Sequence, residues 1–269
     1  MPGFDCGSPE PVPQPGGSGM TPRTIKNHVP EPSTRLPGPV FKVTANASPG
    51  GVWTGIDSDT GLQLYGLADE AGEFHFLPAD GCQYAGTAMT SGDSITGRFD
   101  GFAPIGSTFP DGSTHGTGTI SGTILERASF VAIDQFTTDG GSQHTSGVTL
   151  TFNSVYDQPS SLTSTAGNWT DPSTGTVVNV NATGVIFAQD PNSGCILNGQ
   201  VSIIDASYNA YRVTGSFSSC SGASAVPNGV PLSGLGTINT AASPEQFAIF
   251  VTGQSGGAKY ALTYLLNRS

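Results

Sequence analysis

The sequence predicts an all-β protein built from two tandem antiparallel meander modules of about eight strands each. Two observations carry this prediction. Only 11 % of the 269 residues are charged, whereas 38 are glycine, a composition that favours short strands joined by turns over helices with charged surfaces. The motifs of the first half of the chain also return in the same order in the second half, which indicates a duplicated module.

The duplication rests on motifs that recur at nearly constant spacing. Residues 51, 81, 95 and 116 correspond to residues 167, 194, 213 and 234. The matched motifs are Gly51-Val52-Trp53-Thr54 with Gly167-Asn168-Trp169-Thr170, Gly81-Cys82 with Gly194-Cys195, Ile95-Thr96-Gly97 with Val213-Thr214-Gly215, and Gly116-Thr117-Gly118-Thr119-Ile120 with Gly234-Leu235-Gly236-Thr237-Ile238.

Within each half, apolar residues alternate with polar ones between Gly, Asn and Asp turns, which is typical of strands. Short connections force neighbouring strands to pair antiparallel, and eight such strands remove their unpaired edges by closing into an up-and-down barrel. A sandwich and a single continuous sheet remain as alternatives. In the second half we expect strands near 165–170, 176–182, 185–190, 195–205, 209–219, 230–240, 246–253 and 259–267.

The N-terminal segment differs in composition from the rest of the chain. Ten of the 20 prolines fall within residues 1–40, so this part reads as an extended linker. We therefore expect a tether over 1–45, a first β module over 46–157 and a second over 158–269. Cys6 ahead of the linker resembles the mature start of a bacterial lipoprotein, which implies a lipid anchor upstream of the tether; a free thiol is the alternative.

The charge pattern excludes some classes of partner. The chain has 20 acidic and 9 basic residues, and between positions 43 and 211 the basic ones are Arg98 and Arg127. Without a cationic stripe, we expect neither nucleic-acid binding nor docking on anionic membranes. No apolar run reaches the 18 residues of a membrane helix. Scarce lysine and the cysteine content favour an exported protein at the cell surface, in the periplasm or outside the cell.

One disulfide is expected from the predicted meander. Cys195 and Cys220 fall at the ends of neighbouring strands, each beside a turn, so a bond between them is geometrically easy. Cys82 is left unpaired or joins Cys6. The cysteine spacing matches no zinc motif.

Several fragments match the letters of reactive sites but lack their context. Asp57-Ser58-Asp59-Thr60-Gly61 begins like a calcium loop without the later ligands. Gly253-Gln254-Ser255-Gly256-Gly257 fits a nucleophile elbow, yet it joins two predicted strands instead of feeding a helix. Gly92-Asp93-Ser94 resembles the motif of one esterase class but lacks the helix that follows that motif. Asp59-Thr60-Gly61 resembles the motif of aspartic proteases, which need a second aspartate to share a proton. Its counterpart in the repeat is Ser173-Thr174-Gly175, so this second aspartate is missing.

The remaining acid and base candidates are scattered in the sequence. They are His28, His75, His115 and His144, and the glutamates Glu70, Glu73, Glu126 and Glu245, which do not pair across the repeat. We therefore expect no catalytic residue, no metal site and no cofactor. The inward aromatic residues that would line a barrel cavity, or simply fill it, are Tyr65, Tyr84, Phe187 and Tyr211.

The Gly-x-Trp motifs carry a family resemblance. Gly51-Val52-Trp53 and Gly167-Asn168-Trp169, each ahead of an eight-strand meander, resemble the calycin group of lipocalins and avidins, and Trp169-Thr170-Asp171 followed by Gly175 is closer to avidins. The resemblance implies that Trp53 and Trp169 each close one end of a barrel; core packing is the other interpretation. The stretch from Tyr156 to Leu162 resembles bacterial surface lipoproteins, which implies location and no activity.

Three functions follow from these patterns. The leading hypothesis is a non-catalytic exported binding protein whose barrels present loops or a cavity to an unknown protein or small molecule. The second is a structural subunit of an extracellular assembly, such as an adhesin, filament or surface layer, in which residues 39–45 add as a strand to their own or a neighbouring module. A hydrolase on a β scaffold is the third.

Overall fold

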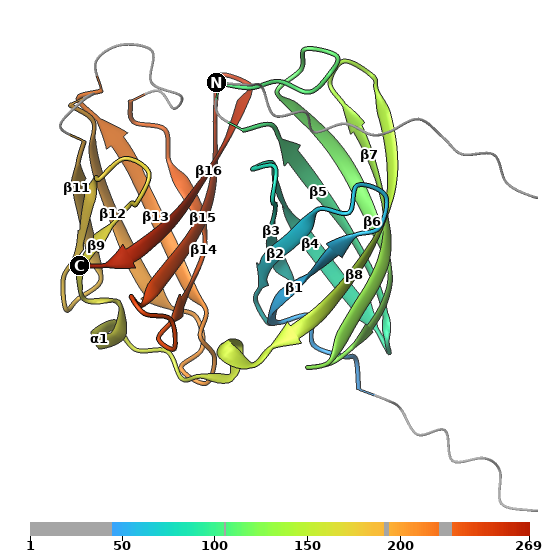
Figure 1. Ribbon diagram of the computed structural model, residues 1–269, viewed down its shortest axis with the longest axis horizontal. Coiled ribbons are helices and arrows are strands. Elements are labelled where there is room, and N and C mark those ends of the chain that lie inside the picture. Colours follow the sequence, from blue (N-terminus) through green and yellow to red (C-terminus); the bar gives the residue numbers. More distant parts are fainter. Residues whose placement is uncertain (1–44, 105, 191–193, 221–227) are drawn as a thin grey trace, which may run out of the picture.

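The computed structural model describes residues 45–104, 106–190, 194–220 and 228–269, and within them the chain forms two closed eight-stranded antiparallel barrels in tandem (Figure 1). Barrel 1 consists of β1 Gly51–Asp57, β2 Gln63–Ala68, β3 Glu73–Pro78, β4 Gln83–Ser91, β5 Ser94–Phe102, β6 His115–Leu125, β7 Ser129–Thr138 and β8 Gln143–Asn153. Barrel 2 consists of β9 Gly167–Thr170, β10 Val177–Val180, β11 Val185–Gln189, β12 Ile196–Ile203, β13 Tyr211–Ser218, β14 Leu232–Asn239, β15 Gln246–Ser255 and β16 Ala258–Arg268.

The short helices η1 (Ser154–Asp157) and α1 (Leu162–Thr165) connect the barrels at their lower ends. Each strand pairs with its neighbour in sequence, so both barrels are simple meanders closed by first-to-last pairing. The predicted fold class is confirmed, and the sandwich and the single continuous sheet are ruled out. Residues 1–44 of the expected tether, including Cys6, lie outside the described residues.

Successive side chains of each strand point alternately into and out of the barrel, and the inward ones fill the barrel interiors. In β6 the inward positions include Gly116, Gly118 and Ile120, while the threonines between them face out. The glycines leave room for rings, because a Cβ on Gly118 would lie 2.3 Å from the ring of Phe99 on the neighbouring strand. Phe99 in turn stacks on Phe136 at 6.0 Å between ring centroids. The inner wall of barrel 1 is thus a packed aromatic core.

Both tryptophans are buried near the starts of their barrels. Trp53 donates its ring N–H to the carbonyl of Pro49, and Trp169 donates to the carbonyl of Thr165. The guanidinium of Arg268 lies 4.1 Å from the ring centroid of Trp169, which is cation–π geometry. Trp169 is therefore held through its ring and its nitrogen, and the ring of Trp53 packs edge-on against Phe152 at 5.6 Å between centroids.

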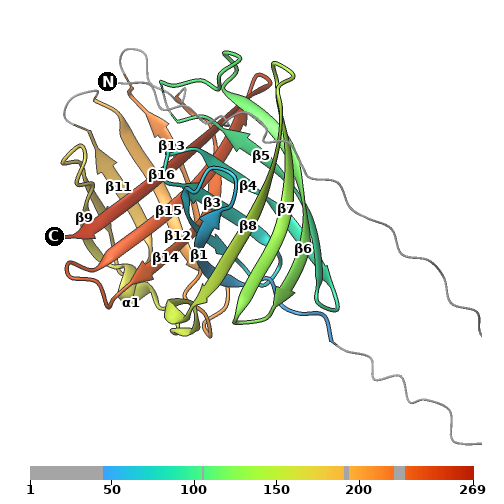
Figure 2. The ribbon, with the colours of Figure 1, turned by 45° about the vertical axis from the view of Figure 1, so that its right-hand side comes forward.

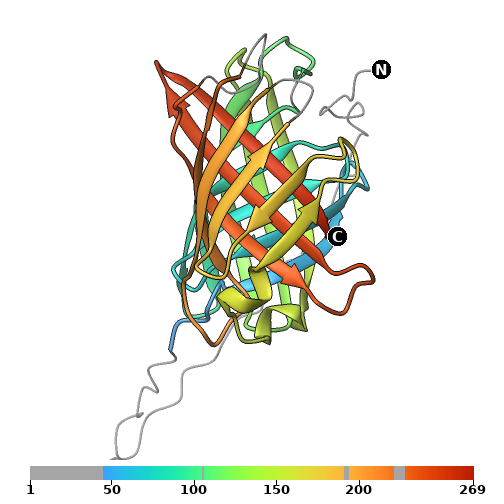
Figure 3. The same ribbon diagram turned by 90° about the vertical axis from the view of Figure 1, so that its left-hand side faces the viewer.

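The two barrels lie side by side and share an apolar interface (Figures 2 and 3). Strands β14 to β16 face β2 to β4. Fully buried Leu67 of barrel 1 and Leu235 and Phe250 of barrel 2 belong to one cluster. Arg212 of β13 adds ion pairs to Asp69 at 3.2 Å and Glu73 at 2.5 Å.

The structure corrects two expectations about inward aromatic residues. Tyr65 points out of barrel 1 into the interface cluster, and Phe187 points out of barrel 2 with 48 % of its surface exposed. Their strand parity explains this, because the inward positions next to them are occupied by Leu64 and Ile186. Tyr84 and Tyr211 do pack in the barrel cores.

The disulfide Cys195–Cys220 is present and joins the ends of β12 and β13, as the meander predicts. Cys82 is also disulfide-bonded, and its partner lies outside the described residues.

Candidate functional site

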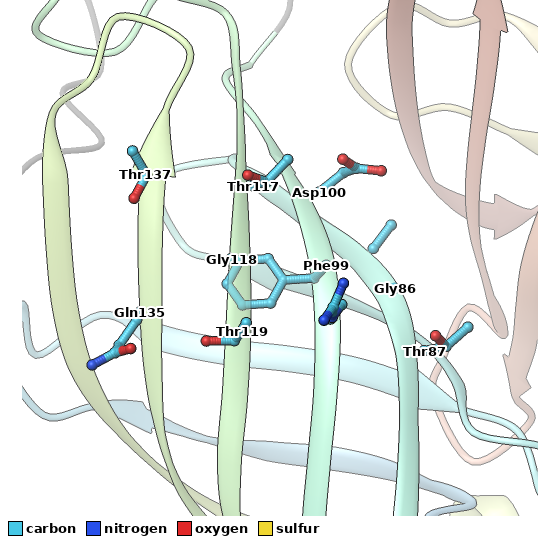
Figure 4. A pocket seen from close by; sticks show the side chains of 11 residues that line it. Gly86, Thr87, Phe99, Asp100, Thr117, Gly118, Thr119, Gln135 and Thr137 are labelled. Atoms are coloured by element: carbon cyan, nitrogen blue, oxygen red, sulfur yellow. The ribbon is translucent and has the colours of Figure 1, made fainter.

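A hollow with a volume of about 670 Å³ lies on the outside of barrel 1, over β4 to β7 (Figure 4). We call it the outer groove. Its lining includes the side chains of Thr87, Arg98, Thr117, Thr119, Gln135 and Thr137, which come from four adjacent strands. Because successive residues of a strand point to opposite faces, these outward positions follow directly from the inward Gly and Phe positions between them.

The strand register aligns these side chains in rows. Arg98 lies opposite Thr87 on one side and Thr119 on the other, and Thr119 lies opposite Gln135. Directly opposed residues on antiparallel strands have Cβ atoms about 5 Å apart. One row therefore presents hydroxyl, guanidinium, hydroxyl and amide groups side by side. These groups donate and accept hydrogen bonds without net repulsion between neighbours.

Arg98 differs from the other basic residues of the described chain. Arg127, Arg212, Lys259 and Arg268 each form an ion pair with a carboxylate. Within the described residues no carboxylate pairs with Arg98, whose side chain is exposed on the outer groove. In a protein with net charge −11, a cation left without an acidic partner is available to an external group.

The groove lining also contains a paired carboxylate, Asp100, two residues from Arg98 on β5. Asp100 accepts from Lys259 of β16 at 2.6 Å and contacts a ring nitrogen of His115 at 3.0 Å. His115 also lies 3.1 Å from Asp139. Lys259 thereby ties the rim of the outer groove to barrel 2, and Asp100 presents little free negative charge to a ligand.

The duplicated module shows that the outer groove belongs to barrel 1 alone. Arg98 corresponds to Ser216 in the repeat, and Thr117 corresponds to Leu235. Leu235 is fully buried against barrel 1. The same face of the module is therefore covered in barrel 2 and open in barrel 1.

The barrel interiors offer much less room than the outer groove. The cavity of barrel 1 measures about 40 Å³ and that of barrel 2 about 30 Å³, space for a few water molecules. The cavity of barrel 2 is lined almost entirely by apolar side chains. Neither interior, as it stands, accommodates an organic ligand of ordinary size.

The cavity of barrel 1 nevertheless contains ionisable groups among its aromatic walls. Asp57, Asp134, His144 and Tyr84 line it. Burial, together with the nearby charge of Asp57, raises the pKa of Asp134 to about 7. Burial would also raise the pKa of Asp57, but hydrogen bonds from Ser146 and the backbone of Thr60 outweigh it and lower the pKa. The two carboxyls thus differ in protonation near neutral pH.

The fragments that resemble reactive sites lie at hairpin turns. Residues 253–257 connect β15 to β16, residues 92–94 connect β4 to β5, and residues 57–61 connect β1 to β2. In the last of these turns Asp57 accepts from the backbone of Asp59 and Thr60. No group of three or more possible metal-ligating side chains comes together in the part of the chain that the structure describes.

The structure places the histidines and glutamates of the described chain in several different surroundings. His75 is buried at the barrel interface beside Glu73 and Gln83, His115 contacts two aspartates, and His144 lines the cavity of barrel 1. Among the glutamates, Glu70 pairs with Arg127, Glu245 pairs with Arg268, and Glu126 accepts a hydrogen bond from the backbone N–H of Ser48. His28 lies outside the described residues.

Two candidate residues were missed by the sequence analysis. Arg98 entered it only as evidence against a cationic stripe, although its outward parity among threonines marks it as a surface cation on a polar face. Asp134 shares its parity with Phe130, Ala132 and Phe136, so the alternation of β7 already places its carboxyl in the barrel. Reading polar residues at inward positions would have found it.

No protein-family model, curated protein or solved structure matches this chain. Among the described residues, none of the helices has the length and apolar character needed to cross a membrane.

Proposed function

We propose that the protein is a non-catalytic, exported binding protein that holds its ligand in the outer groove of barrel 1. The observation that carries the proposal is a 670 Å³ hollow in which uncharged hydrogen-bonding groups surround Arg98, a cation with no acidic partner among the described residues, while Asp100, the carboxylate of the lining, is paired with Lys259. The Cys195–Cys220 disulfide supports export, since disulfides persist in oxidising compartments. The small barrel cavities favour the outer surface over the interior as the binding site.

The groove chemistry fits a polyhydroxylated ligand with one carboxylate, such as an acidic sugar unit. Threonine hydroxyls and the Gln135 amide both donate and accept, so they match sugar hydroxyls. The guanidinium of Arg98 matches a carboxylate with two parallel N–H donors. The net charge of −11 opposes a dense polyanion, so we expect one anionic group per site.

The test compares acidic and neutral sugars on the full chain. Binding of galacturonic acid, which carries one carboxylate, and of neutral galactose is measured by calorimetry and by amide chemical-shift mapping, with wild type, Arg98→Gln and the control Ser216→Ala. Losing a charge-assisted hydrogen bond costs about 1.5–3 kcal/mol, which is a loss of about tenfold or more in affinity. We expect this loss for Arg98→Gln with the acidic sugar alone.

Ser216→Ala changes the matching position of barrel 2 and should bind both sugars as wild type does. Equal affinity of wild type and Arg98→Gln for the acidic sugar, or shifts that map away from β4 to β7, would contradict the proposal.

A further inference from the structure

The last strand of barrel 2 has an edge that the barrel does not cover. β16 pairs with β15 from Ala258 to Asn267, but β9 pairs with it only at Asn267 and Arg268. The equivalent closure of barrel 1 is longer, because β1 pairs with β8 at six positions from Val52 to Asp57. In Figure 1, β16 crosses the front of barrel 2 and meets β9 only near the C-terminus.

The sequence explains the difference between the two closures. β9 has 4 residues where β1 has 7, and β10 has 4 where β2 has 6. Both hairpins end in the same turn, since Asp171 donates its N–H to Thr176 as Asp57 does to Leu62. Pro172, which has no N–H, then follows Asp171 at once. The first hairpin of barrel 2 is therefore too short to reach along β16.

The exposed edge, residues 258–266 of β16, carries unused backbone groups. Alternate residues of a strand direct their N–H and C=O groups to opposite sides. On the side away from β15, these groups have no hydrogen-bond partner within the described residues. The inward-facing Tyr260 and Tyr264 remain partly exposed beside this gap, and Leu265 is 51 % exposed on the outer face. Such an edge is a template for one further strand.

We propose that the exposed edge of β16 receives residues 40–45 of a second copy of this chain as an added antiparallel or parallel strand. The segment Val40-Phe41-Lys42-Val43-Thr44-Ala45 alternates two sets of side chains and is rich in β-branched and aromatic residues, as a strand requires. In one orientation Phe41 and Val43 cover the partly exposed tyrosines, and Lys42 faces outward.

The N-terminal segment and the barrels carry net charges of opposite sign. Residues 1–44 contain four basic and three acidic residues, a net charge of +1, whereas residues 45–269 contain five basic and seventeen acidic residues, a net charge of −12. Attraction between the N-terminal segment and the acidic barrels favours their encounter.

The place where the described chain begins selects a second copy over the same copy. Ala47 is fixed to the β4–β5 turn of barrel 1 by backbone bonding to Gly92 and by Thr90. The described chain starts at the lower end of barrel 1, on the side away from barrel 2 (Figure 1). Six extended residues span at most about 20 Å, so residues 40–45 stay near their own Ala47. The edge that they reach is therefore that of a neighbouring molecule.

Strand addition of this kind joins unlike surfaces of the two copies. Each molecule offers its own segment to one neighbour and its own β16 edge to another, so the contact is heterologous and produces open chains or rings. This assembly is independent of the ligand proposed for the outer groove.

The experiment measures hydrogen exchange at the edge together with the oligomeric state of the full chain. Wild type, Val43→Pro and the control Thr34→Pro are compared by sedimentation velocity and by amide exchange of residues 258–266 over a range of protein concentrations. Proline at position 43 removes one ladder donor without touching either barrel. Proline at position 34 changes the same segment outside the strand.

We expect wild type and Thr34→Pro to form dimers and longer species with rising concentration, and exchange at alternate amides of 258–266 to slow by about tenfold or more. Val43→Pro should remain monomeric with fast exchange. A wild type that stays monomeric, slow exchange that does not depend on concentration, or assembly of Val43→Pro equal to wild type would each overturn the proposal.

Discussion

Replacing the buried carboxyl of Asp134 by an amide should stabilise the protein at alkaline pH and have little effect in acid. Asp134 lines the cavity of barrel 1, where burial and the charge of Asp57 raise its pKa to about 7 from the ordinary 3.8 of an aspartate. The shift is about 3 pKa units, equivalent to about 4 kcal/mol at 1.36 kcal/mol per unit. Because the side chain keeps some solvent contact, we reduce the expected effect to about 3 kcal/mol.

The direction of the pH dependence follows from proton binding in the two states. Below pH 4 the carboxyl is protonated in the folded and the unfolded protein, and its ionisation contributes nothing. Between pH 4 and 7 the folded state binds the proton more tightly, so the free energy of unfolding falls as pH rises. Above pH 7 the folded state holds a buried charge, and the full cost is present.

Urea unfolding of wild type and Asp134→Asn at pH 4, 6 and 8 measures this effect. We expect the two proteins to unfold with nearly equal free energies at pH 4, and Asp134→Asn to be more stable by about 3 kcal/mol at pH 8. Asp93→Asn, at an exposed turn, is the control and should match wild type throughout. The reasoning fails if the difference between wild type and Asp134→Asn is the same at pH 4 and pH 8.

Three further substitutions test the packing of the barrels by urea unfolding. Arg212→Met leaves the buried Asp69 of barrel 1 unpaired at the interface and should lower the free energy of unfolding by about 2–4 kcal/mol. A loss below about 0.5 kcal/mol, on the order of a surface ion pair, would contradict this role of Arg212. Replacing both Cys195 and Cys220 by alanine opens a link between residues 25 apart and should cost about 3 kcal/mol, whereas an unchanged midpoint would contradict it. Arg268→Met removes the cation over Trp169 and two bonds to carbonyls around α1, with an expected loss of about 2 kcal/mol and a changed tryptophan emission; identical spectra and stability would argue against this contact.

The internal repeat made the fold predictable. The second-half strands expected near 209–219 and 246–253 correspond to β13 and β15, and the Cys195–Cys220 bond follows from adjacent strands. Alternation determines which face a residue occupies once the register is known, but it does not say which outer face is covered. Tyr65 was misplaced for this reason, because an outward aromatic residue in an interface has the same pattern as an inward one.

The candidate site was harder to predict because it depends on Arg98 having no carboxylate partner among the described residues. The importance of Arg98 comes from carboxylates that pair with every other basic residue of the described barrels, which no single-sequence pattern records. The short closure of barrel 2 was visible in principle, since Pro172 and the shorter spacing from Trp169 to Gly175 can be compared with the first half.

The docking of barrel 2 on barrel 1 uses a face whose copy in barrel 1 is polar, so the two modules are not interchangeable in this contact. Leu235 and Phe250, paired in register, form part of the docking face, and the repeat places Thr117 and Thr137 at the same positions in barrel 1. With leucine and phenylalanine there, each molecule could stack on the next by the same contact without end. The threonines give barrel 1 a polar outer face at the positions of the docking face, as the outer face of a terminal repeat is polar in a solenoid.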